Sequence, residues 1–235
     1  MISEILEKWC AENSMQISDK QKENFEKYAK LLVEWNEKIN LTAITEEKEI
    51  AVKHFIDSIS ILKYADIKNS ASVIDIGTGA GFPGIPLKIM RDDIKLTLLD
   101  SLNKRLVFLD EVCKELGISA ELIHARAEEG GQKPELREQY DIAVSRAVAN
   151  LPALCEYCMP YVKVGGAFVS MKGSDGENEL EYAKNAISLL GGETEQIETL
   201  TLPDSSTRTI ITIRKVNSTP PKYPRRSAKI NKQTL

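Results

Sequence analysis

The spacing of apolar residues along the chain changes near position 70. Before it, apolar residues recur every three or four positions, so that Ile2, Leu6 and Trp9 share one face of a helix. No segment there alternates between apolar and polar residues as a half-buried strand does. The pattern therefore predicts that residues 1–65 form an N-terminal helical cap, which packs its apolar faces against the rest of the chain.

Two further helices are expected within this cap. Ser18 is a typical residue for a helix start. The apolar spacing continues from there until residues 35–44, which break the helical pattern. Another helix is expected from about residue 46 to residue 64.

Beyond residue 70, short apolar runs alternate with amphipathic stretches. The expected strands are residues 72–76, 95–99, 120–123, 140–145, 166–171, 196–202 and 208–214. The expected helices between them are residues 103–116, 149–162 and 176–190. Strands that alternate with helices form a parallel sheet covered on both faces, whereas the last two strands follow each other closely and form an antiparallel pair. Residues 66–215 are therefore expected to form an α/β, Rossmann-like core with a seven-stranded, mainly parallel sheet, as in class I S-adenosylmethionine-dependent methyltransferases.

The segment Asp75–Pro86 is rich in glycine and joins the first strand to a helical stretch that opens at Pro83. Gly77, Gly79 and Gly81 alternate within it. Glycine adopts positive φ and places no Cβ between the backbone and a ligand. The free N–H groups of the new helix face the same ligand. The segment therefore favours a nucleotide-like cofactor, although a tight glycine turn that binds nothing has the same general pattern.

Two cofactor classes compete for this loop, and the first is a dinucleotide. The spacing from Gly79 to Gly84 fits the dinucleotide pattern, and Asp100 at the end of the second strand could bind a ribose hydroxyl. This interpretation would indicate an NAD-dependent enzyme. Pro83 and Pro86 disfavour it, because they lie where the helix of that pattern packs closely on its strand.

The second class is S-adenosylmethionine, and its pattern begins at Asp75, two residues before Gly77. A carboxylate there suits a cofactor with a cationic methionine amino group and no pyrophosphate. Asp75, Gly77 and Gly79 would then bind this cofactor, and Asp100 would accept hydrogen bonds from its ribose hydroxyls. This pattern favours a methyltransferase over a dehydrogenase.

Further candidate residues come after the third and fourth strands, at the carboxyl edge of the sheet where ligands bind. Ala127 and Glu128 come after the third strand and are expected to contact the adenine. Arg146 comes at the end of the fourth strand. It could bind the cofactor carboxylate or a substrate phosphate, or form an ordinary surface salt bridge.

The absence of certain motifs narrows the set of methylation reactions that the chain could catalyse. No Asn/Asp-Pro-Pro-aromatic motif, common in methylation of exocyclic base nitrogens, comes after the fourth strand. Cys155 and Cys158 lie inside the expected helix 149–162, a poor place for the nucleophile of pyrimidine C5 methylation. Without a second ligand pair, these cysteines predict no metal site. The N7 of guanine needs no deprotonation, so catalysis there would rest on alignment and electrostatics.

Charge is unevenly distributed along the chain. Of 31 basic and 35 acidic residues, eight basic and no acidic ones come after Asp204, so the balance is −12 up to that residue and +8 beyond it. Such asymmetry suggests a basic arm for a polyanion, and a solubilising disordered tail is the alternative. Several prolines indicate that this arm, residues 216–235, is extended when bound. Lys222, Arg225 and Arg226 are its expected RNA contacts.

The remaining composition is ordinary for a globular protein, with 42% hydrophobic and 28% charged residues. No apolar run approaches the roughly 20 residues that a membrane span needs. The N-terminal residues include early acids and no apolar signal region, and four cysteines are compatible with a reducing cytosol. We therefore expect a cytoplasmic protein without a membrane partner, and a monomer, because nothing in the sequence demands a partner subunit.

Nine segments along the chain carry a shared family pattern. They are Asp75–Pro86, Leu99–Arg105, Arg126–Glu128, Ser145–Val148, Met171–Gly173, Trp35–Asn36, Asn40–Thr42, His54–Ser58 and Lys222–Arg225. Together they resemble the RsmG (GidB) family of bacterial guanine-N7 methyltransferases of small-subunit ribosomal RNA. The resemblance extends over almost the whole chain, and the combination is far more specific than any one motif.

The resemblance implies transfer of a methyl group from S-adenosylmethionine to a guanine N7 in 16S rRNA, presented as RNA or as the 30S subunit. Gly77 and Phe82 would line the cofactor pocket, and Arg146 would close the site. Arg146 and Lys172 are the expected catalytic residues, with orienting or charge-stabilising roles. Further candidates for the acceptor side are Asn40, His54, Asp57 and Ser58; His54 could instead be an interface histidine between cap and sheet.

Two other functions stay open on the sequence alone. The first is methyl transfer by the same fold to a small molecule. The second is a non-catalytic RNA-binding role in ribosome assembly.

Overall fold

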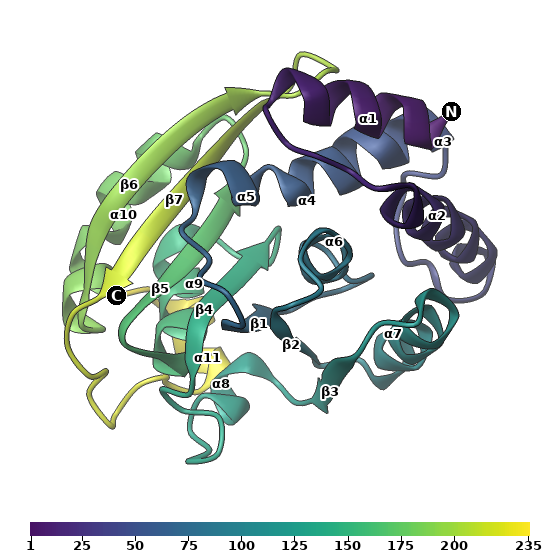
Figure 1. Cartoon of the computed structure of the whole chain (residues 1–235). Coiled ribbons are helices and arrows are strands. Elements are labelled where there is room, and N and C mark those ends of the chain that lie inside the picture. Colours follow the sequence, from purple (N-terminus) through teal and green to yellow (C-terminus); the bar gives the residue numbers. More distant parts are fainter.

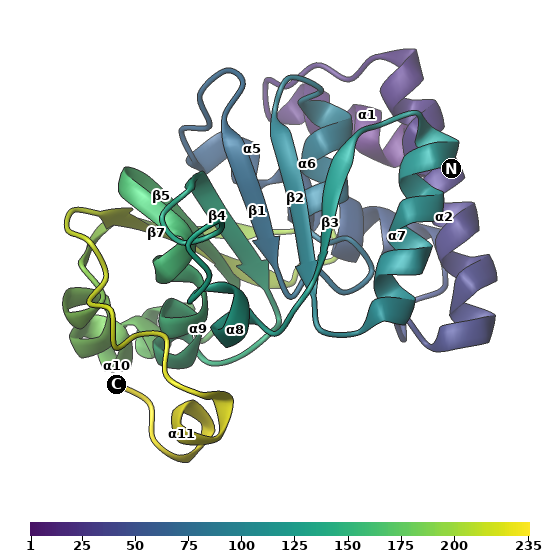
Figure 2. The same ribbon diagram turned by 90° about the horizontal axis from the view of Figure 1, so that it is seen from below.

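The computed structural model describes residues 1–235 and contains a seven-stranded sheet with helices on both faces (Figure 1, Figure 2). The strands are β1 (Ser72–Ile76), β2 (Lys95–Asp100), β3 (Ala120–His124), β4 (Tyr140–Arg146), β5 (Val162–Lys172), β6 (Gly192–Thr201) and β7 (Thr207–Lys215). Their order is β3-β2-β1-β4-β5-β7-β6. β7 is antiparallel to both neighbours, and the other pairs are parallel. The predicted mainly parallel α/β sheet with a final antiparallel pair is confirmed.

Helices precede, separate and follow these strands. They are α1 (Ile2–Glu12), α2 (Asp19–Ile39), α3 (Glu47–Glu49), a π-helix (Ile50–Ile56), α4 (Asp57–Ile59), α5 (Ile61–Tyr64), α6 (Gly84–Met90), α7 (Asn103–Leu116), α8 (Ala127–Gly130), α9 (Leu151–Cys158), a 3-10 helix (Met159–Tyr161), α10 (Gly176–Leu189) and α11 (Ser227–Lys232). The predicted bounds of α7 match those in the structure.

Successive residues of the central strands face two separate cores. Val73 of β1 packs among α1, α2, α6 and α7, whereas the next residue, Ile74, packs among α9 and α10. Side chains of successive strand residues point to opposite faces of a sheet. A strand buried on both faces therefore reads as a near-continuous apolar run, which is the pattern of β1.

The N-terminal helices α1 to α5 cover one face of the sheet together with α6 and α7 (Figure 1). The core on this face has 40 buried residues, against 26 on the other face, so cap and sheet share the larger core. Ser18 begins α2 as predicted. Its hydroxyl accepts a hydrogen bond from the Gln21 N–H, and the Gln21 side chain accepts one from the Ser18 N–H.

α2 continues to Ile39, through part of the segment expected to break it. The reason is tertiary packing, because Trp35 and Ile39 are both partly buried against the core. The Trp35 ring lies 5.7 Å from the ring centroid of Phe108 on α7. Contacts with a distant helix thus override the weaker local pattern.

The helix expected from about residue 46 to residue 64 is present, but its centre is a π-helix over Ile50–Ile56. Such wide turns are rare and occur frequently at functional sites. This one contains Lys53 and His54, and it is followed directly by Asp57 in α4. The apolar period of the sequence does not reveal a local change from an α-helix to a π-helix.

Residues 216–235 fold back onto the second face of the sheet, and the expectation that they are extended when bound to a partner stays a prediction. Tyr223 and Ile230 are buried in the core that contains α9 and α10. The Arg137 guanidinium donates hydrogen bonds to the carbonyl oxygens of Tyr223 at 2.8 Å and Thr219 at 2.7 Å. Figure 2 shows α11, in yellow, beside α8 and α9.

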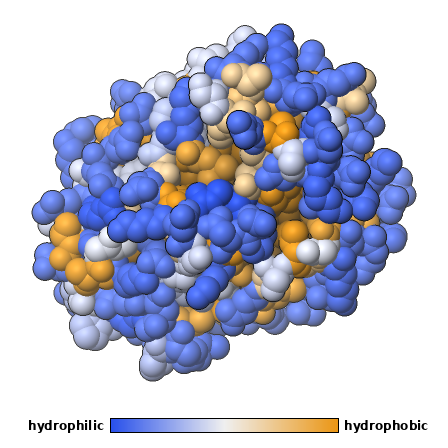
Figure 3. All heavy atoms as spheres, in the orientation of Figure 1, coloured by the Kyte–Doolittle hydropathy of each residue, from blue (hydrophilic) through white to orange (hydrophobic).

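The molecular face in Figure 3 is mostly hydrophilic, and apolar residues gather toward its centre, over the region where Figure 1 shows α4 and α6. None of the helices combines the length and the apolar character that crossing a membrane requires.

Candidate functional site

A cavity of about 380 Å³ lies at the carboxyl ends of β1, β2, β3 and β4, and we call it the β1–β4 cavity. The strand order reverses between β1 and β4. Open α/β sheets bind ligands at such a point. Of the residues predicted for cofactor binding, the cavity brings together Gly77, Asp100, Ala127 and Glu128.

Two glycines with positive φ shape the turn after β1. Gly77 has φ +70°, and a Cβ at this position would lie 2.7 Å from Cγ2 of Val148. Gly79 has φ +60°, and its N–H donates a hydrogen bond to Oδ2 of Asp100 at 2.9 Å. Gly77 lines the β1–β4 cavity, whereas Gly79 is not among its lining residues. The turn thus needs glycine at 77 both for its backbone angle and for the approach of Val148.

Asp75 points away from the cavity, into the protein. The residue has no exposed surface, and its Oδ2 accepts hydrogen bonds from Thr78 Oγ1 at 2.7 Å and from the Gly84 N–H at 2.8 Å. Its Oδ1 has no hydrogen-bond partner. Burial raises the pKa of this carboxyl to about 6. In this structure Asp75 braces the glycine loop against α6, and its expected contact with the cofactor stays a prediction.

Asp100 also holds the glycine loop, but it lines the β1–β4 cavity as well. Besides the bond to Gly79, its Oδ1 accepts a hydrogen bond from the Leu102 N–H at 2.8 Å, and Arg105 Nη1 lies 3.3 Å from its Oδ2. Only 1% of Asp100 is exposed. A ribose bound here would therefore have to share the Asp100 carboxylate with the donors of Gly79, Leu102 and Arg105. The role of Asp100 in ribose binding stays a prediction.

Ala127 and Glu128 begin α8 and are half-buried in the wall of the cavity. Three further lining residues were missed by the sequence analysis: Tyr157 of α9 and Ser227 and Asn231 of α11. No local motif marks them. They reach the cavity only because the C-terminal segment folds back.

A second cavity, also of about 380 Å³, lies beside the first at the ends of β4 and β5, and we call it the β4–β5 cavity. The predicted residues that it brings together are His54, Asp57, Arg146 and Lys172. Lys53, Glu179 and Arg208 also line it and were not anticipated. Ala147, with φ +56°, lines both cavities.

Arg146 makes its side-chain contacts on the side of the β4–β5 cavity. Its Nη1 donates hydrogen bonds to Asp57 Oδ2 at 2.9 Å and to the Lys53 carbonyl oxygen at 3.1 Å. Its guanidinium carbon lies 4.9 Å from the centroid of the Phe82 ring, a cation–π contact. Arg208 Nε lies 3.2 Å from Asp57 Oδ1, an ion-pair contact without hydrogen-bond geometry. Arg146 is therefore turned toward the second cavity and does not line the first, where we had also considered it.

His54 is a buried, neutral link between the cap and the sheet. Arginine can only donate, so the 3.3 Å contact from Arg146 Nη2 makes His54 Nδ1 an acceptor. His54 Nε2 then carries the hydrogen and donates to Thr42 Oγ1 at 2.9 Å. Burial, and secondarily the positive charge of Arg146, lowers the pKa of His54 to about 3. This geometry agrees with the interface alternative and with a place in the wall of the β4–β5 cavity.

Lys172 ends β5 and is nearly buried. Its Nζ donates a hydrogen bond to the Ala149 carbonyl oxygen at 2.8 Å and forms an ion pair with Glu179 Oε2 at 2.7 Å. The same Glu179 oxygen accepts a hydrogen bond from the Leu151 N–H at 2.6 Å. Lys172 is thus held at the cavity wall by groups from the β4–α9 connection and α10.

Besides Asp75, Gly79 and the predicted residues of the C-terminal arm, three further predicted residues lie outside the linings of both cavities. Phe82 is buried beneath Arg146, and its ring stacks on His54 with a centroid distance of 4.4 Å. Ser58 has no exposed surface and donates a hydrogen bond to the His54 carbonyl oxygen. Asn40 caps the end of α2 with φ +47°. The first two support the walls of the site from behind.

The eight basic residues after Asp204 divide into two groups. Arg208, Arg214, Lys215 and Arg225 form ion pairs with acidic residues. Lys222, Arg226, Lys229 and Lys232 are exposed and form no ion pair. Arg225, an expected RNA contact, is therefore paired within the protein, and its RNA role stays a prediction. It is bound to Glu156, which has no exposed surface, with Nη2 to Oε2 at 2.6 Å.

Cys155 and Cys158 are both fully buried. Burial raises the pKa of both thiols well above their ordinary value. Protonated thiols away from the sheet edge are poor nucleophiles, in agreement with the sequence analysis.

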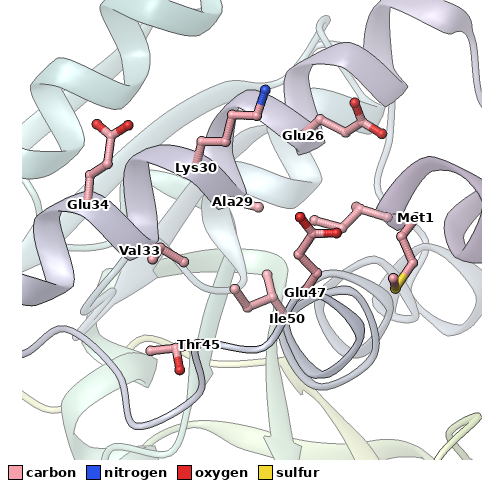
Figure 4. Close-up of a pocket in the computed structure, with 10 residues that line it drawn as sticks. Met1, Glu26, Ala29, Lys30, Val33, Glu34, Thr45, Glu47 and Ile50 are labelled. Carbon is pink, nitrogen blue, oxygen red and sulfur yellow. The ribbon is translucent and has the colours of Figure 1, made fainter.

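A third cavity, of about 440 Å³, lies between the N-terminus, α2 and the first turns of the helix that begins at Glu47 (Figure 4). It is lined by Glu26, Lys30 and Glu34, among others, and by none of the predicted site residues. It shares no lining residue with the two cavities above.

Comparison with known proteins gives a consistent result. Residues 21–210 match the family described as rRNA small subunit methyltransferase G, GidB. A protein named ribosomal RNA small subunit methyltransferase G from Alkaliphilus metalliredigens is 50% identical over 233 residues, 98% of each chain. A protein of the same name from Desulforamulus reducens is 52% identical over 224 residues, 94% of this chain and 93% of its own.

Solved structures with low sequence identity share the fold. TrmN from Thermus thermophilus matches with a TM-score of 0.53 and 15% identity over 68% of this chain and 48% of its own. TYW2 of P. horikoshii in complex with MeSAdo matches with a TM-score of 0.54 and 14% identity over 68% of this chain and 61% of its own. The expected class I methyltransferase fold is thus confirmed.

Proposed function

Because the chain belongs to the rRNA small subunit methyltransferase G family, we propose that it transfers a methyl group from S-adenosylmethionine to the N7 of a guanine in 16S rRNA. Membership of this family supports rRNA methylation as the reaction. The choice of guanine N7 is our proposal and rests on the chemistry of the residues at the site.

The β1–β4 cavity fits S-adenosylmethionine in position and in chemistry. It lies at the switch point of the sheet, and Gly77 leaves its floor free of a side chain. Asp100 offers a carboxylate that can accept from ribose hydroxyls, and Glu128 offers one that can accept from an adenine amino group. Ala127 and Val148 provide apolar surface for the base. We therefore assign the methyl donor to this cavity.

The shared wall at Ala147 is the observation that carries the proposal. It joins the donor cavity to the β4–β5 cavity, which has four cationic residues: Lys53, Arg146, Lys172 and Arg208. Cations of this kind suit the phosphates and the O6 atom of a guanine nucleotide. We assign the acceptor nucleotide to the β4–β5 cavity, with Arg146 and Lys172 as the groups that orient it.

S-adenosylmethionine, when bound, supplies a methyl group on a positively charged sulfonium, which the N7 lone pair of guanine can attack without prior loss of a proton. The histidine of the acceptor cavity suits this chemistry. His54 is held neutral with its Nδ1 occupied by Arg146, so it is not free to accept a proton from substrate. The residues therefore act by alignment and electrostatics, as an acceptor without a proton to lose requires.

The acidic residues of the acceptor cavity have a role in the same reaction. Methyl transfer moves the positive charge from the donor to the guanine ring. Asp57 and Glu179 line this cavity among its cations, and Asp57 Oδ1 lacks a hydrogen-bond partner. Carboxylates near a developing positive charge stabilise it. We propose that Asp57 serves the acceptor in this way, with Arg146 and Arg208 holding it in place.

The experiment is label transfer to ribosomal substrate. The protein is incubated with methyl-labelled S-adenosylmethionine and 30S subunits, or 16S rRNA alone, from a strain that lacks the modification. The expected result is label in 16S rRNA, with chain cleavage at one guanine after borohydride and aniline treatment, which reports N7 methylation. Subunits from a modified strain are the matched control and should take up no label.

Two results would contradict the proposal. Label in rRNA without borohydride-dependent cleavage would exclude N7. No label in rRNA despite measurable binding of the donor would favour a small-molecule acceptor or a non-catalytic role.

A further inference from the structure

We infer that Ser227 and Asn231 are part of the methyl-donor site, so that the C-terminal segment closes the cavity that holds the donor. This inference rests on the proposed function, because it takes the β1–β4 cavity as the donor site. It concerns residues that no local motif marks, on the segment first interpreted as a free arm.

The lining of the cavity is the first observation. Ser227 and Asn231 lie one turn apart on α11, and both line the same cavity as Gly77, Asp100 and Glu128. The remaining lining comes from the sheet edge, the start of α7, α8, the β4–α9 connection and Tyr157 of α9. Without α11 the cavity would lack a wall on this side.

The second observation is the polar contact between α11 and α9. Tyr157 Oη lies 3.4 Å from Asn231 Oδ1, and Asn231 Nδ2 lies 3.5 Å from Ser227 Oγ. Both contacts are at the long limit of a hydrogen bond. Only 8% of Tyr157 is exposed, whereas Asn231 is exposed and Ser227 half-buried. The three polar groups are thus gathered at the cavity with capacity for a further partner.

Their chemistry complements the rest of the wall. The charged side chains of the cavity are Asp100, Arg105, Arg126 and Glu128. Adenine is neutral and presents both donors and acceptors at its edge. A hydroxyl and an amide can supply either role, whereas an ionised carboxylate only accepts and an arginine only donates. Ser227 and Asn231 therefore supply neutral groups that suit a nucleoside.

The anchoring of the segment is the third observation. Immediately before α11, Arg225 forms hydrogen bonds with both carboxylate oxygens of the fully buried Glu156, at 2.6 to 3.1 Å. Ile230, between the two proposed residues, has no exposed surface. The opposite side of the same short helix carries Lys229 and Lys232, which are exposed and form no ion pair. One segment thus contributes to the donor wall and presents cations to a polyanion.

Calorimetry on the full-length protein tests the inference, with S-adenosylhomocysteine as the probe. The double variant Ser227→Ala/Asn231→Ala should raise the Kd about tenfold, as expected for the loss of one or two hydrogen bonds. Gln233→Ala, at an exposed residue directly after the same helix and outside the cavity lining, is the matched control and should leave the Kd unchanged. The melting temperature of each variant without ligand should stay at the wild-type value.

A second measurement needs no variant. Trypsin can cut the wild-type protein after Arg226, Lys229 and Lys232, and S-adenosylhomocysteine should slow these cuts if it binds against α11. This inference would be overturned if the wild-type protein binds S-adenosylhomocysteine, the double variant binds it with the same Kd, and the ligand gives no protection from trypsin. That outcome would leave the proposed function intact. Absence of any binding to the wild-type protein would overturn both.

Discussion

Arg146 donates a hydrogen bond of 3.3 Å from Nη2 to Nδ1 of His54, and this contact fixes the imidazole in its neutral form. The pair joins the π-helix of the cap to the end of β4 at the wall of the β4–β5 cavity. Protonation of His54 would place a second positive charge against the guanidinium. The relation between these two residues therefore makes the stability of the fold depend on pH.

We expect stability to decrease as the pH falls from 7.5 to 5.0, partly because of His54. Its pKa is about 3 in the folded protein and 6.5 in the ordinary case, so below pH 6.5 the unfolded chain binds the proton that the folded one excludes. This difference lowers the free energy of unfolding by about 2 kcal/mol at pH 5.0. Urea unfolding of the wild type and of His54→Gln at both pH values measures it as the difference in their pH dependence. His124→Gln, at an exposed histidine, is the control and should behave as the wild type does.

Asp75 should show the opposite pH dependence. Burial raises its pKa to about 6, so the folded protein keeps this proton as the pH rises past the ordinary value, and the stabilisation disappears above pH 6. Between pH 5.0 and 7.5, Asp75→Asn should gain about 1 kcal/mol in free energy of unfolding relative to the wild type. The same variant tests whether Asp75 braces the loop or contacts the cofactor. If Asp75 braces the loop, Asp75→Asn should still bind S-adenosylhomocysteine at pH 7.5. Loss of binding in a folded variant would support the direct contact expected from the sequence.

Gly77→Ala should weaken donor binding as well as stability. The alanine would adopt positive φ, at a cost of about 1 kcal/mol, and its Cβ would displace Val148 at the cavity wall. Gly117→Ala is the matched control, because Gly117 also has positive φ (+63°) but a Cβ there meets no atom within 4 Å. Both variants should lose similar stability in urea unfolding, and only Gly77→Ala should bind S-adenosylhomocysteine more weakly. Equal binding by the two variants would argue against a donor at this turn.

Arg225→Ala should destabilise the protein by about 3 kcal/mol, because it leaves the carboxylate of Glu156 buried without its partner. The exposed neighbour provides the control, and Arg226→Ala should change stability by less than about 0.5 kcal/mol. The double variant Glu156→Gln/Arg225→Gln should recover part of the loss because no unpaired charge remains. A neutral effect of Arg225→Ala would mean that the C-terminal segment is not anchored by this pair.

The four free cations of the C-terminal segment should contribute to RNA affinity through phosphate contacts. Changing Lys222, Arg226, Lys229 and Lys232 together to alanine should reduce the slope of log K against log salt by about 3, if all four contact phosphates of single-stranded RNA. Binding to a 16S rRNA fragment is measured over a range of salt concentrations. Lys184→Ala, at a lysine paired with Glu181 on α10, is the control and should leave the slope unchanged. An unchanged slope in the quadruple variant would place the RNA elsewhere.

The sequence was most informative where structure depends on local pattern. The positions of the strands and of α7 were predicted from the periodicity of apolar residues. The start of α2 was predicted because Ser18 can cap a helix. Ala127 and Glu128 lie at the β1–β4 cavity because the carboxyl ends of neighbouring parallel strands share one edge. Position along a strand thus predicts position in the site.

Side-chain direction and long-range pairing could not be obtained in this way. Nothing in the spacing of Asp75 shows that its carboxylate turns inward to Gly84, or that Phe82 lies beneath Arg146. The basic character of Arg225 suggested a free arm, because its partner Glu156 lies 69 positions earlier in the chain. Charge counted along a sequence omits such partners, and the fold supplies them.

Ala147 has one further consequence. It is the residue common to the walls of both cavities, and it holds its place with a backbone conformation that larger or β-branched residues adopt poorly. Under the proposed assignment of donor and acceptor, the boundary between them includes main chain, which retreats less readily than a flexible side chain does. We therefore expect donor analogues with ethyl or larger alkyl groups to react more slowly than the methyl donor.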